Sequence, residues 1–106
     1  MYGYVYMSTN SSTGMKYIGI NRAVKFNKEV VGDTEAILKD ISTYGKHNFH
    51  VEMLMPYEDE HTLEFGLNAF IKKYDALNDP SFYNCEKPKR SRKKRSEDES
   101  LSAVVE

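Results

Sequence analysis

The sequence predicts an α+β fold, in which a small three-stranded antiparallel sheet is flanked by helices. Near the N-terminus, residues 3–8 and 15–20 are rich in aromatic and β-branched side chains, and the turn-forming residues 10–14 lie between them. Further along, two segments repeat apolar residues at helical spacing, and the segment between them alternates as a strand does. The expected order is therefore strand, strand, helix, strand and helix, and the first two strands form a hairpin.

The first strand of the hairpin is expected to place different side chains on the two faces of the sheet. Successive residues of a strand point to opposite faces. Tyr4, Tyr6 and Ser8 therefore share one face. Val5 and Met7 share the other.

The first helix is expected to follow residues 21–32, which have no clean period and should form a loop or a short helix. Asp33 or Thr34 can cap this helix, which runs through Tyr44, and Gly45 can end it in the left-handed conformation. The side chains expected to face the core are Ile37, Leu38, Ile41 and Tyr44.

The third strand is expected over residues 48–55, with one face buried and with Pro56 stopping it. The alternation that predicts it consists of Phe49, Val51, Met53 and Met55 interleaved with His50, Glu52 and Leu54.

The second helix is expected to begin where Asp59 and Glu60 place negative charge, because such charge favours a helix N-terminus. A turn-rich stretch follows it, and Phe82-Tyr83-Asn84 should add a last extended piece against the core. The apolar side chains that recur at helical spacing are Leu63, Leu67, Phe70, Ile71 and Tyr74.

The chain is expected to divide into a globular domain, residues 1–86, and a disordered tail, residues 87–106, that is basic and then acidic. A length of 106 residues and a hydrophobic fraction of 40% suit one domain with one core. The formal net charge of -1 conceals a segregation, because seven of the 15 basic residues lie within residues 87–95. Four of the 16 acidic residues also lie in the tail, so the domain carries a net charge near -4.

The composition also bears on the compartment. Cys85 is the only cysteine and cannot form a disulfide within one chain, so a reducing compartment is expected. No apolar run approaches the roughly 20 residues that span a bilayer, and the N-terminus lacks the layout of a signal peptide. The protein is therefore expected to be soluble and cytoplasmic, with no membrane partner.

The tail begins with a dense basic cluster, and such a cluster gains affinity for nucleic acid by releasing condensed counterions. Two other functions fit the same residues. They are a nuclear-import signal, if the host has a nucleus, and a segment that docks on an acidic protein partner. The basic cluster consists of Lys87, Lys89, Arg90, Arg92, Lys93, Lys94 and Arg95.

Several short motifs, taken in this order, resemble those of the GIY-YIG nuclease family. Tyr4-Val5-Tyr6 and Tyr17-Ile18-Gly19 resemble the two halves of the signature that names the family. The resemblance covers nearly all of the expected domain and suggests a phage or viral origin. Three later segments resemble landmarks of phage-type GIY-YIG homing endonuclease domains, namely Tyr44-Gly45-Lys46-His47-Asn48-Phe49, Phe70-Ile71-Lys72-Lys73-Tyr74 and Phe82-Tyr83-Asn84.

The resemblance implies a site for phosphodiester cleavage. In that family, a hairpin tyrosine helps to deprotonate an attacking water, an arginine on the first helix stabilises the phosphate, and a helix glutamate holds one divalent metal. By this resemblance, Tyr6 and Tyr17 match the hairpin tyrosines, and Asn84 matches an asparagine near the phosphate site.

The metal-binding glutamate of the family is missing. Its position is Leu67, whose alkyl group cannot coordinate an ion and which also fits the apolar stripe of its own helix. Glu64, one helical turn earlier, is a weak candidate for the same task, although a solvated helix acid also explains it. No metal site is assigned and no cofactor is expected, and Mg²⁺ or Mn²⁺ would be needed only if nuclease activity survives.

The arginine of the family is missing as well, because its position falls near Asn27. Arg22, Lys25 and Lys28 are the possible replacements for binding phosphate, and surface solvation also explains all three. A lysine would hold phosphate less specifically than the planar guanidinium does. The three histidines show no metal-ligand spacing and are assigned no role.

Three functions fit this sequence. The first is a degenerate GIY-YIG-like domain, catalytically impaired, that associates with DNA or RNA mainly through its basic tail. The second is a structural or protein-interaction factor that uses the same scaffold, with the acidic domain as its binding face. The third is an active, metal-dependent endonuclease in which Glu64 holds the metal and Arg22 or Lys25 binds the phosphate.

Overall fold

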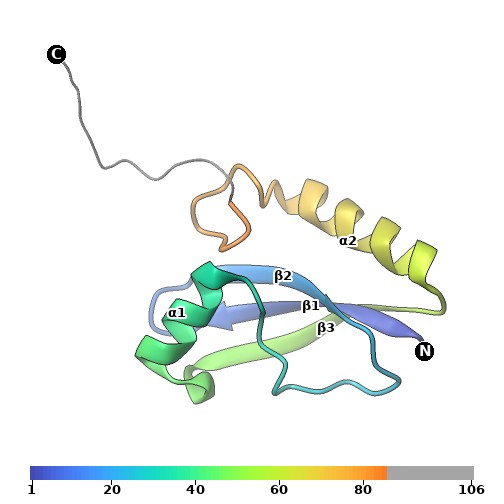
Figure 1. The fold of residues 1–106 in the computed structure, drawn as a ribbon. Coiled ribbons are helices and arrows are strands. Elements are labelled where there is room, and N and C mark those ends of the chain that lie inside the picture. The colour runs from blue at the N-terminus through green and yellow to red at the C-terminus, as the bar shows by residue number, and fades with distance from the viewer. Residues whose placement is uncertain (86–106) are drawn as a thin grey trace, which may run out of the picture.

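A three-stranded antiparallel sheet forms the centre of the fold, in the strand order β2-β1-β3. The computed structural model describes residues 1–85, and the expected tail lies outside them. The predicted α+β fold and the predicted order of its elements are confirmed (Figure 1). The elements are β1 (Gly3–Asn10), β2 (Lys16–Asn21), α1 (Glu35–Tyr44), the short 3-10 helix η1 (Lys46–Asn48), β3 (Phe49–Tyr57) and α2 (Glu60–Tyr74).

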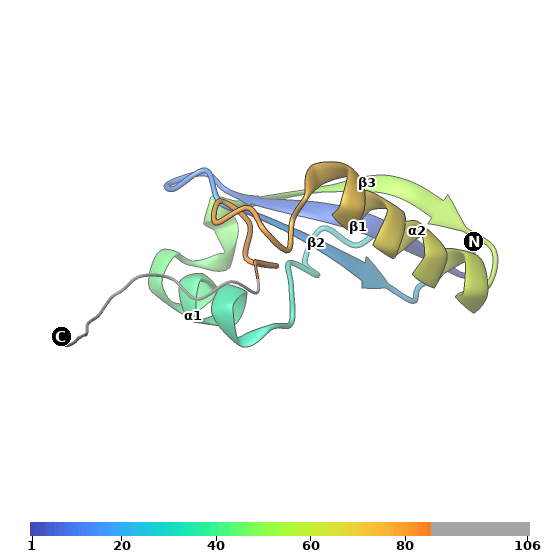
Figure 2. The ribbon, with the colours of Figure 1, turned by 90° about the horizontal axis from the view of Figure 1, so that it is seen from above.

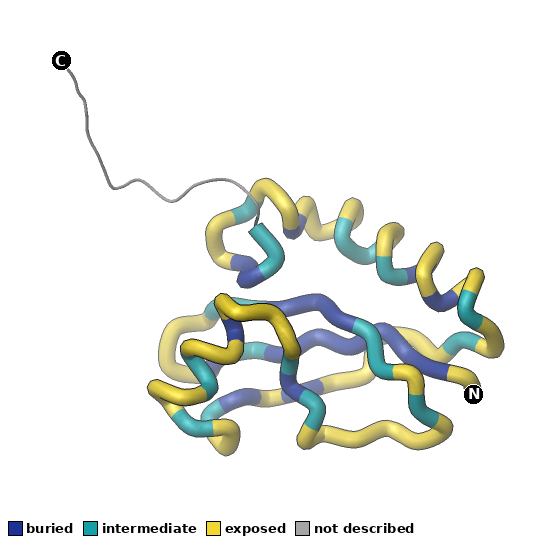
Figure 3. The backbone as a smooth tube through the Cα atoms, viewed as in Figure 1, coloured by how far each residue is buried: buried dark blue, intermediate teal, exposed yellow. Residues whose placement is uncertain are grey.

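Strand β1 lies between the other two strands and is buried on both faces. On one face Tyr4 and Tyr6 belong to the same apolar cluster as Ile37 of α1. On the other face Val5 belongs to a cluster with Leu63 of α2. Figure 2 shows α2 lying along the sheet and α1 near the hairpin end, and Figure 3 shows the buried residues concentrated in the strands. The predicted division of the two faces is confirmed.

Helix α1 packs on the sheet through a narrower side than the sequence predicted. Ile37 is fully buried and Ile41 is partly buried, one turn further along. Leu38 is 49% exposed and Tyr44 is 37% exposed, so the prediction that these two side chains face the core is wrong. Leu38 lies about 100° around the helix from Ile37, which turns it away from the sheet.

The segments that flank α1 differ in detail from the prediction. The residues between β2 and α1 form a loop, one of the two forms that the sequence allowed. Thr34 is the N-cap but makes no side-chain hydrogen bond to the helix. Gly45 has the expected positive φ of 87°, but its ψ of 144° is extended, so the predicted left-handed conformation is wrong.

Strand β3 continues through Pro56 to Tyr57, so the prediction that Pro56 stops it is wrong. Pro56 lies opposite Tyr4 in the β1–β3 register. A proline removes one backbone donor, and an edge strand tolerates this loss because only one of its sides is paired. β3 is such an edge strand, since β1 is its neighbour in the sheet.

A β-bulge changes the facing of β3. Met55 lies opposite Val5, whereas Met53 lies opposite Tyr6, so Leu54 is an extra residue on β3. At the start of β3 the predicted alternation holds, since Phe49 and Val51 are buried. The extra residue Leu54 packs toward α2, whereas Met53 before it and Met55 after it are 41% and 45% exposed. The predicted burial of these two methionines is therefore wrong.

Helix α2 follows the prediction closely. Asp59 is its N-cap and accepts a hydrogen bond from the Thr62 backbone N–H over 2.8 Å. Gly66 faces the ring of Tyr57, and a Cβ atom there would lie 2.2 Å from that ring. No helix in the described part of the chain is long and apolar enough to cross a bilayer. On the side of α2 that faces the sheet, Leu63 is fully buried, and the partly buried side chains beside it include Leu67, Phe70 and Ile71.

The chain that follows α2 returns to the free edge of β2. Phe82 forms one parallel bridge with Lys16, and both Phe82 and Tyr83 are buried. The N–H of Tyr83 donates to the Lys16 carbonyl over 2.7 Å. The predicted last piece therefore does pack against the core, although it forms one bridge and not a strand.

Leu63→Ala is expected to lower the free energy of unfolding by about 2–5 kcal/mol, because it leaves a cavity between α2 and the sheet. Phe65→Ala is the matched control, since Phe65 lies on the same helix and is 71% exposed. Its effect is expected to stay within about 0.5 kcal/mol. Urea denaturation followed by circular dichroism measures both variants, and equal losses would contradict this packing of α2.

Candidate functional site

Tyr6 of β1 and Tyr17 of β2 come together on the side of the sheet that α1 covers. Their ring centroids lie 6.2 Å apart, with 54° between the ring planes. Gly19 lies opposite Tyr6 in the β1–β2 register. A Cβ atom on Gly19 would lie 2.8 Å from the Tyr6 hydroxyl oxygen and 2.6 Å from Cε2 of Tyr17. The glycine of the Tyr-Ile-Gly motif therefore leaves the space that both rings occupy.

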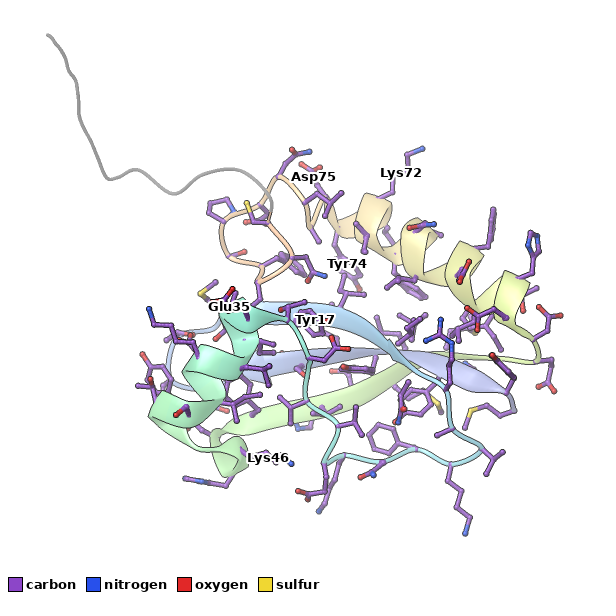
Figure 4. All side chains as sticks on the ribbon, in the orientation of Figure 1. Tyr17, Glu35, Lys46, Lys72, Tyr74 and Asp75 are labelled. Carbon is purple, nitrogen blue, oxygen red and sulfur yellow. The ribbon has the colours of Figure 1, made fainter. Side chains whose placement is uncertain are left out.

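The carboxylate of Asp33 lies beside this tyrosine pair. The Tyr17 hydroxyl donates a hydrogen bond to Oδ1 of Asp33 over 3.0 Å, and Figure 4 shows Tyr17 near the start of α1, where Glu35 is labelled. Burial raises the pKa of Tyr6 and of Tyr17 well above the ordinary value, and the hydrogen bond to Asp33 raises the pKa of Tyr17 further. Both phenols therefore stay protonated at neutral pH.

Asp33 is a candidate residue that sequence reasoning missed. The sequence offered it as a possible helix cap, whereas the structure pairs its carboxylate with Tyr17. A carboxylate just before a helix gives the same local pattern in either role, and only the tertiary fold brings residue 17 within reach. One oxygen ligand for a hard cation therefore stands next to the phenols.

Asn84 is committed to the backbone of β2. Its Oδ1 accepts a hydrogen bond from the Ile18 N–H, and its Nδ2 donates to the Ile18 carbonyl, both over 2.9 Å. The side-chain amide thus extends the edge of β2 as a neighbouring strand would. Both polar atoms of Asn84 have partners, so it holds the chain beyond α2 in place.

Glu64 and Arg22 belong to an exposed ion cluster with Glu60. Arg22 makes a two-point contact with Glu60, with Nε and Nη2 each 2.6 Å from a carboxylate oxygen, and Nη2 lies 3.8 Å from Glu64. The guanidinium holds the pKa of Glu60 well below its ordinary range. Glu60, as hydrogen-bond partner and like charge, raises the pKa of Glu64. Glu60 therefore engages the Nε and Nη2 donors of Arg22.

Leu67, which stands where the resemblance places a metal ligand, makes apolar contacts. Leu67 is partly buried against the cluster that holds Val5 and Leu63. Within residues 1–85, no group of three or more His, Cys, Asp or Glu side chains is arranged to hold a metal ion. Glu64 contacts Arg22, and no described contact joins it to the tyrosine pair.

The remaining basic candidates lie in the loop before α1 or outside the described residues. Lys25 and Lys28 are exposed in the loop between β2 and α1, and Lys28 lines a surface cavity. The basic cluster of residues 87–95 lies beyond residue 85, where the described structure ends.

Comparison with known proteins finds a partial relative. Over 58 residues the chain is 36% identical to a protein named "Putative endonuclease segE" from Enterobacteria phage T4. The match covers 55% of this chain and 28% of the phage protein, so it spans little more than a quarter of that protein. No protein-family model matches the chain, and no solved structure matches it significantly. The chain is therefore distantly similar to a phage protein with the name of an endonuclease.

The buried phenols predict a loss of stability at alkaline pH. The unfolded chain releases tyrosine protons near a pH of about 10, whereas the folded chain retains those of Tyr6 and Tyr17. Above that pH the unfolded state binds fewer protons, so the free energy of unfolding falls. The expected slope is about 1.4 kcal/mol per pH unit for each phenol, and it continues until the folded state also releases the proton.

Urea denaturation at a series of alkaline pH values measures this slope. The double variant Tyr6→Phe, Tyr17→Phe is the comparison, because it keeps both rings and removes both titrating hydroxyls. Its free energy of unfolding is expected to fall less steeply with pH than that of the unaltered chain. The same slope in both chains would show that these phenols are open to solvent.

Proposed function

We propose that this chain is a nucleic-acid-associated protein of phage or viral origin, built on a degenerate GIY-YIG-like domain whose cleavage activity is impaired. The partial similarity to the T4 protein named as an endonuclease supports a nuclease-like ancestry. The paired tyrosines, with Gly19 making room for them, support the resemblance to the GIY-YIG family. The basic residues 87–95 supply most of the affinity for DNA or RNA.

The proposal that cleavage is impaired rests on the apolar surroundings of Leu67. Attack on a phosphodiester develops charge on the phosphate oxygens, and a metal ion with a second cation normally offsets it. Leu67 packs as hydrocarbon against hydrocarbon where the resemblance expects a carboxylate. This position therefore supplies no ligand for a metal.

The groups that this chain retains also support binding without efficient cleavage. Burial raises the pKa of Tyr6 and of Tyr17, so the deprotonated phenol that could accept a proton from water is rarer here than at an exposed tyrosine. Arg22 is paired with Glu60, and Asn84 is paired with backbone. Tyr17, Arg22 and Asn84 thus each have partners within the fold.

The proposal predicts salt-sensitive binding of nucleic acid by the full chain. In a filter-binding assay, log affinity for duplex DNA should fall against log salt by about 0.9 for each phosphate neutralised. Replacing the seven basic residues of the tail by Gln should remove most of the affinity. Lys72→Gln with Lys73→Gln is the control, because it removes exposed basic charge from α2 and should change affinity little. Lack of salt-sensitive binding by the full chain would refute the proposal.

Asp33 favours a second candidate function, residual metal-dependent cleavage. Its carboxylate contacts the Tyr17 phenol. Mg²⁺ is usually held in proteins by one or two carboxylates, with water and substrate phosphate completing its coordination. On this candidate Asp33 would hold the divalent ion, whose chemistry would be to offset charge on the phosphate.

Incubation of supercoiled plasmid with Mg²⁺ or Mn²⁺ distinguishes the two candidates. If cleavage is lost, the unaltered chain should nick plasmid no faster than the Tyr17→Phe variant does. If Asp33 acts, nicking should be measurable, Asp33→Asn should abolish it, and the control Glu64→Ala should leave it intact. Nicking that depends on Glu64 would instead support the role that the sequence left open for that residue.

A further inference from the structure

A surface cavity of about 600 Å³ lies between the loop that precedes α1 and the start of β3. This volume falls within the range of small-molecule sites in proteins, roughly 300–1,000 Å³. Phe26 of the loop and Phe49 of β3 both line the cavity. Phe26 is 41% exposed, so part of its ring is open to a ligand.

The loop side of the cavity is anchored by Tyr4. The buried Tyr4 hydroxyl accepts a hydrogen bond from the Asn27 backbone N–H over 3.0 Å. The ring of Phe26 lies beside the Tyr4 ring, with centroids 5.6 Å apart. Asn27 in turn accepts a hydrogen bond from the Glu29 N–H through its own side chain. The loop is thus tied to the central strand, and the aromatic side of the cavity is built before any ligand arrives.

The opposite side of the cavity is basic and comes from η1 and β3. Lys46 and His47 lie on η1, and His50 lies on β3. Gly45 helps to place His47, because a Cβ atom on Gly45 would lie 2.6 Å from the imidazole Cε1. Lys46 is labelled in Figure 4 on the turn that follows α1.

The charge of the cavity suits an anion, although the globular domain as a whole is acidic. Lys28 and Lys46 line it, and Glu29 is the acidic residue among the lining residues. The distance from the Lys46 Nζ to the Glu29 carboxylate is 4.0 Å, and both side chains are more than half exposed. An exposed pair at this distance contributes little, so Lys46 can turn to a phosphate at small cost.

We infer that this cavity binds one nucleotide of a single-stranded nucleic acid, with the base against Phe26 and the phosphate beside Lys28 and Lys46. Aromatic side chains next to basic ones are the combination that binds single strands, because every base presents a flat face for stacking. A duplex hides those faces inside its own stack. This inference rests on the proposed association with nucleic acid, and it adds a site within the domain that is separate from the tail.

The histidines of the chain provide a direct test by NMR. His47 and His50 line the cavity, whereas His61 lies on α2 and serves as an internal control. A short single-stranded oligodeoxynucleotide added to the full chain should shift the imidazole resonances of His47 and His50 and leave those of His61 unchanged. Equal shifts of all three, or no shift at saturation, would overturn the site.

Two variants of the full chain test the assigned contacts through the affinity for the same oligonucleotide. Phe26→Leu keeps an apolar side chain on Tyr4 but removes the stacking ring, and it should weaken binding about tenfold. Phe26→Tyr keeps a ring and should restore the affinity, which separates stacking from folding. Lys28→Gln with Lys46→Gln should make the slope of log affinity against log salt shallower by about 0.7, the value for one phosphate of a single strand.

The results distinguish failure of the site from failure of the proposed function. If the full chain binds nucleic acid but the cavity variants bind the single strand as tightly as before, the site is wrong and the proposed function stands. If the full chain binds no nucleic acid, both are wrong. Tighter binding of a free nucleoside monophosphate than of the oligonucleotide would overturn the assignment to a strand. The assignment would also fail if an acidic peptide displaced the oligonucleotide from the Phe26→Leu variant as well as it does from the unaltered chain.

Discussion

Burial of β1 on both faces is the constraint on which the rest of the structure depends. As the middle strand, β1 supports α1 and the loop before it on one face and α2 on the other. The same burial takes phenol groups out of water. Burial therefore raises the pKa of Tyr6, and Tyr4 turns its hydroxyl to the backbone of Asn27. The strand that holds the layers together thus also sets the chemistry of the tyrosines.

The sequence predicted those features that depend on local pattern. The hairpin, the facing of β1 and the length of α2 follow from alternation, helical spacing and a capping Asp59. The bulge at Leu54 depends on how β3 meets β1, which no local pattern records. The contacts of Asp33 and Asn84 likewise join residues far apart in the chain, with partners 16 and 66 positions away. Such contacts exist only in the folded chain.

The partners of the hairpin tyrosines decide what the candidate site can do. Tyr6 and Tyr17 keep their places in the hairpin, but the neighbour that the structure gives Tyr17 is the anionic Asp33 and not a cation. An anion beside a phenol opposes its ionisation. The comparison adds a distant similarity, over 58 residues, to a phage protein named as a putative endonuclease.

The irregular β3 also has a consequence for how the protein behaves at high concentration. Within residues 1–85 its outer side carries no further strand, and exposed Met53 and Met55 make that side partly apolar. A regular, unpaired and partly apolar strand edge can pair with a strand of another copy, and such pairing leads to aggregation. Here the bulge at Leu54 and the missing donor of Pro56 break the row of pairing groups. The bulge and the proline, neither of which the sequence pattern predicted in place, thus make the β3 edge less able to pair with a second copy of the chain.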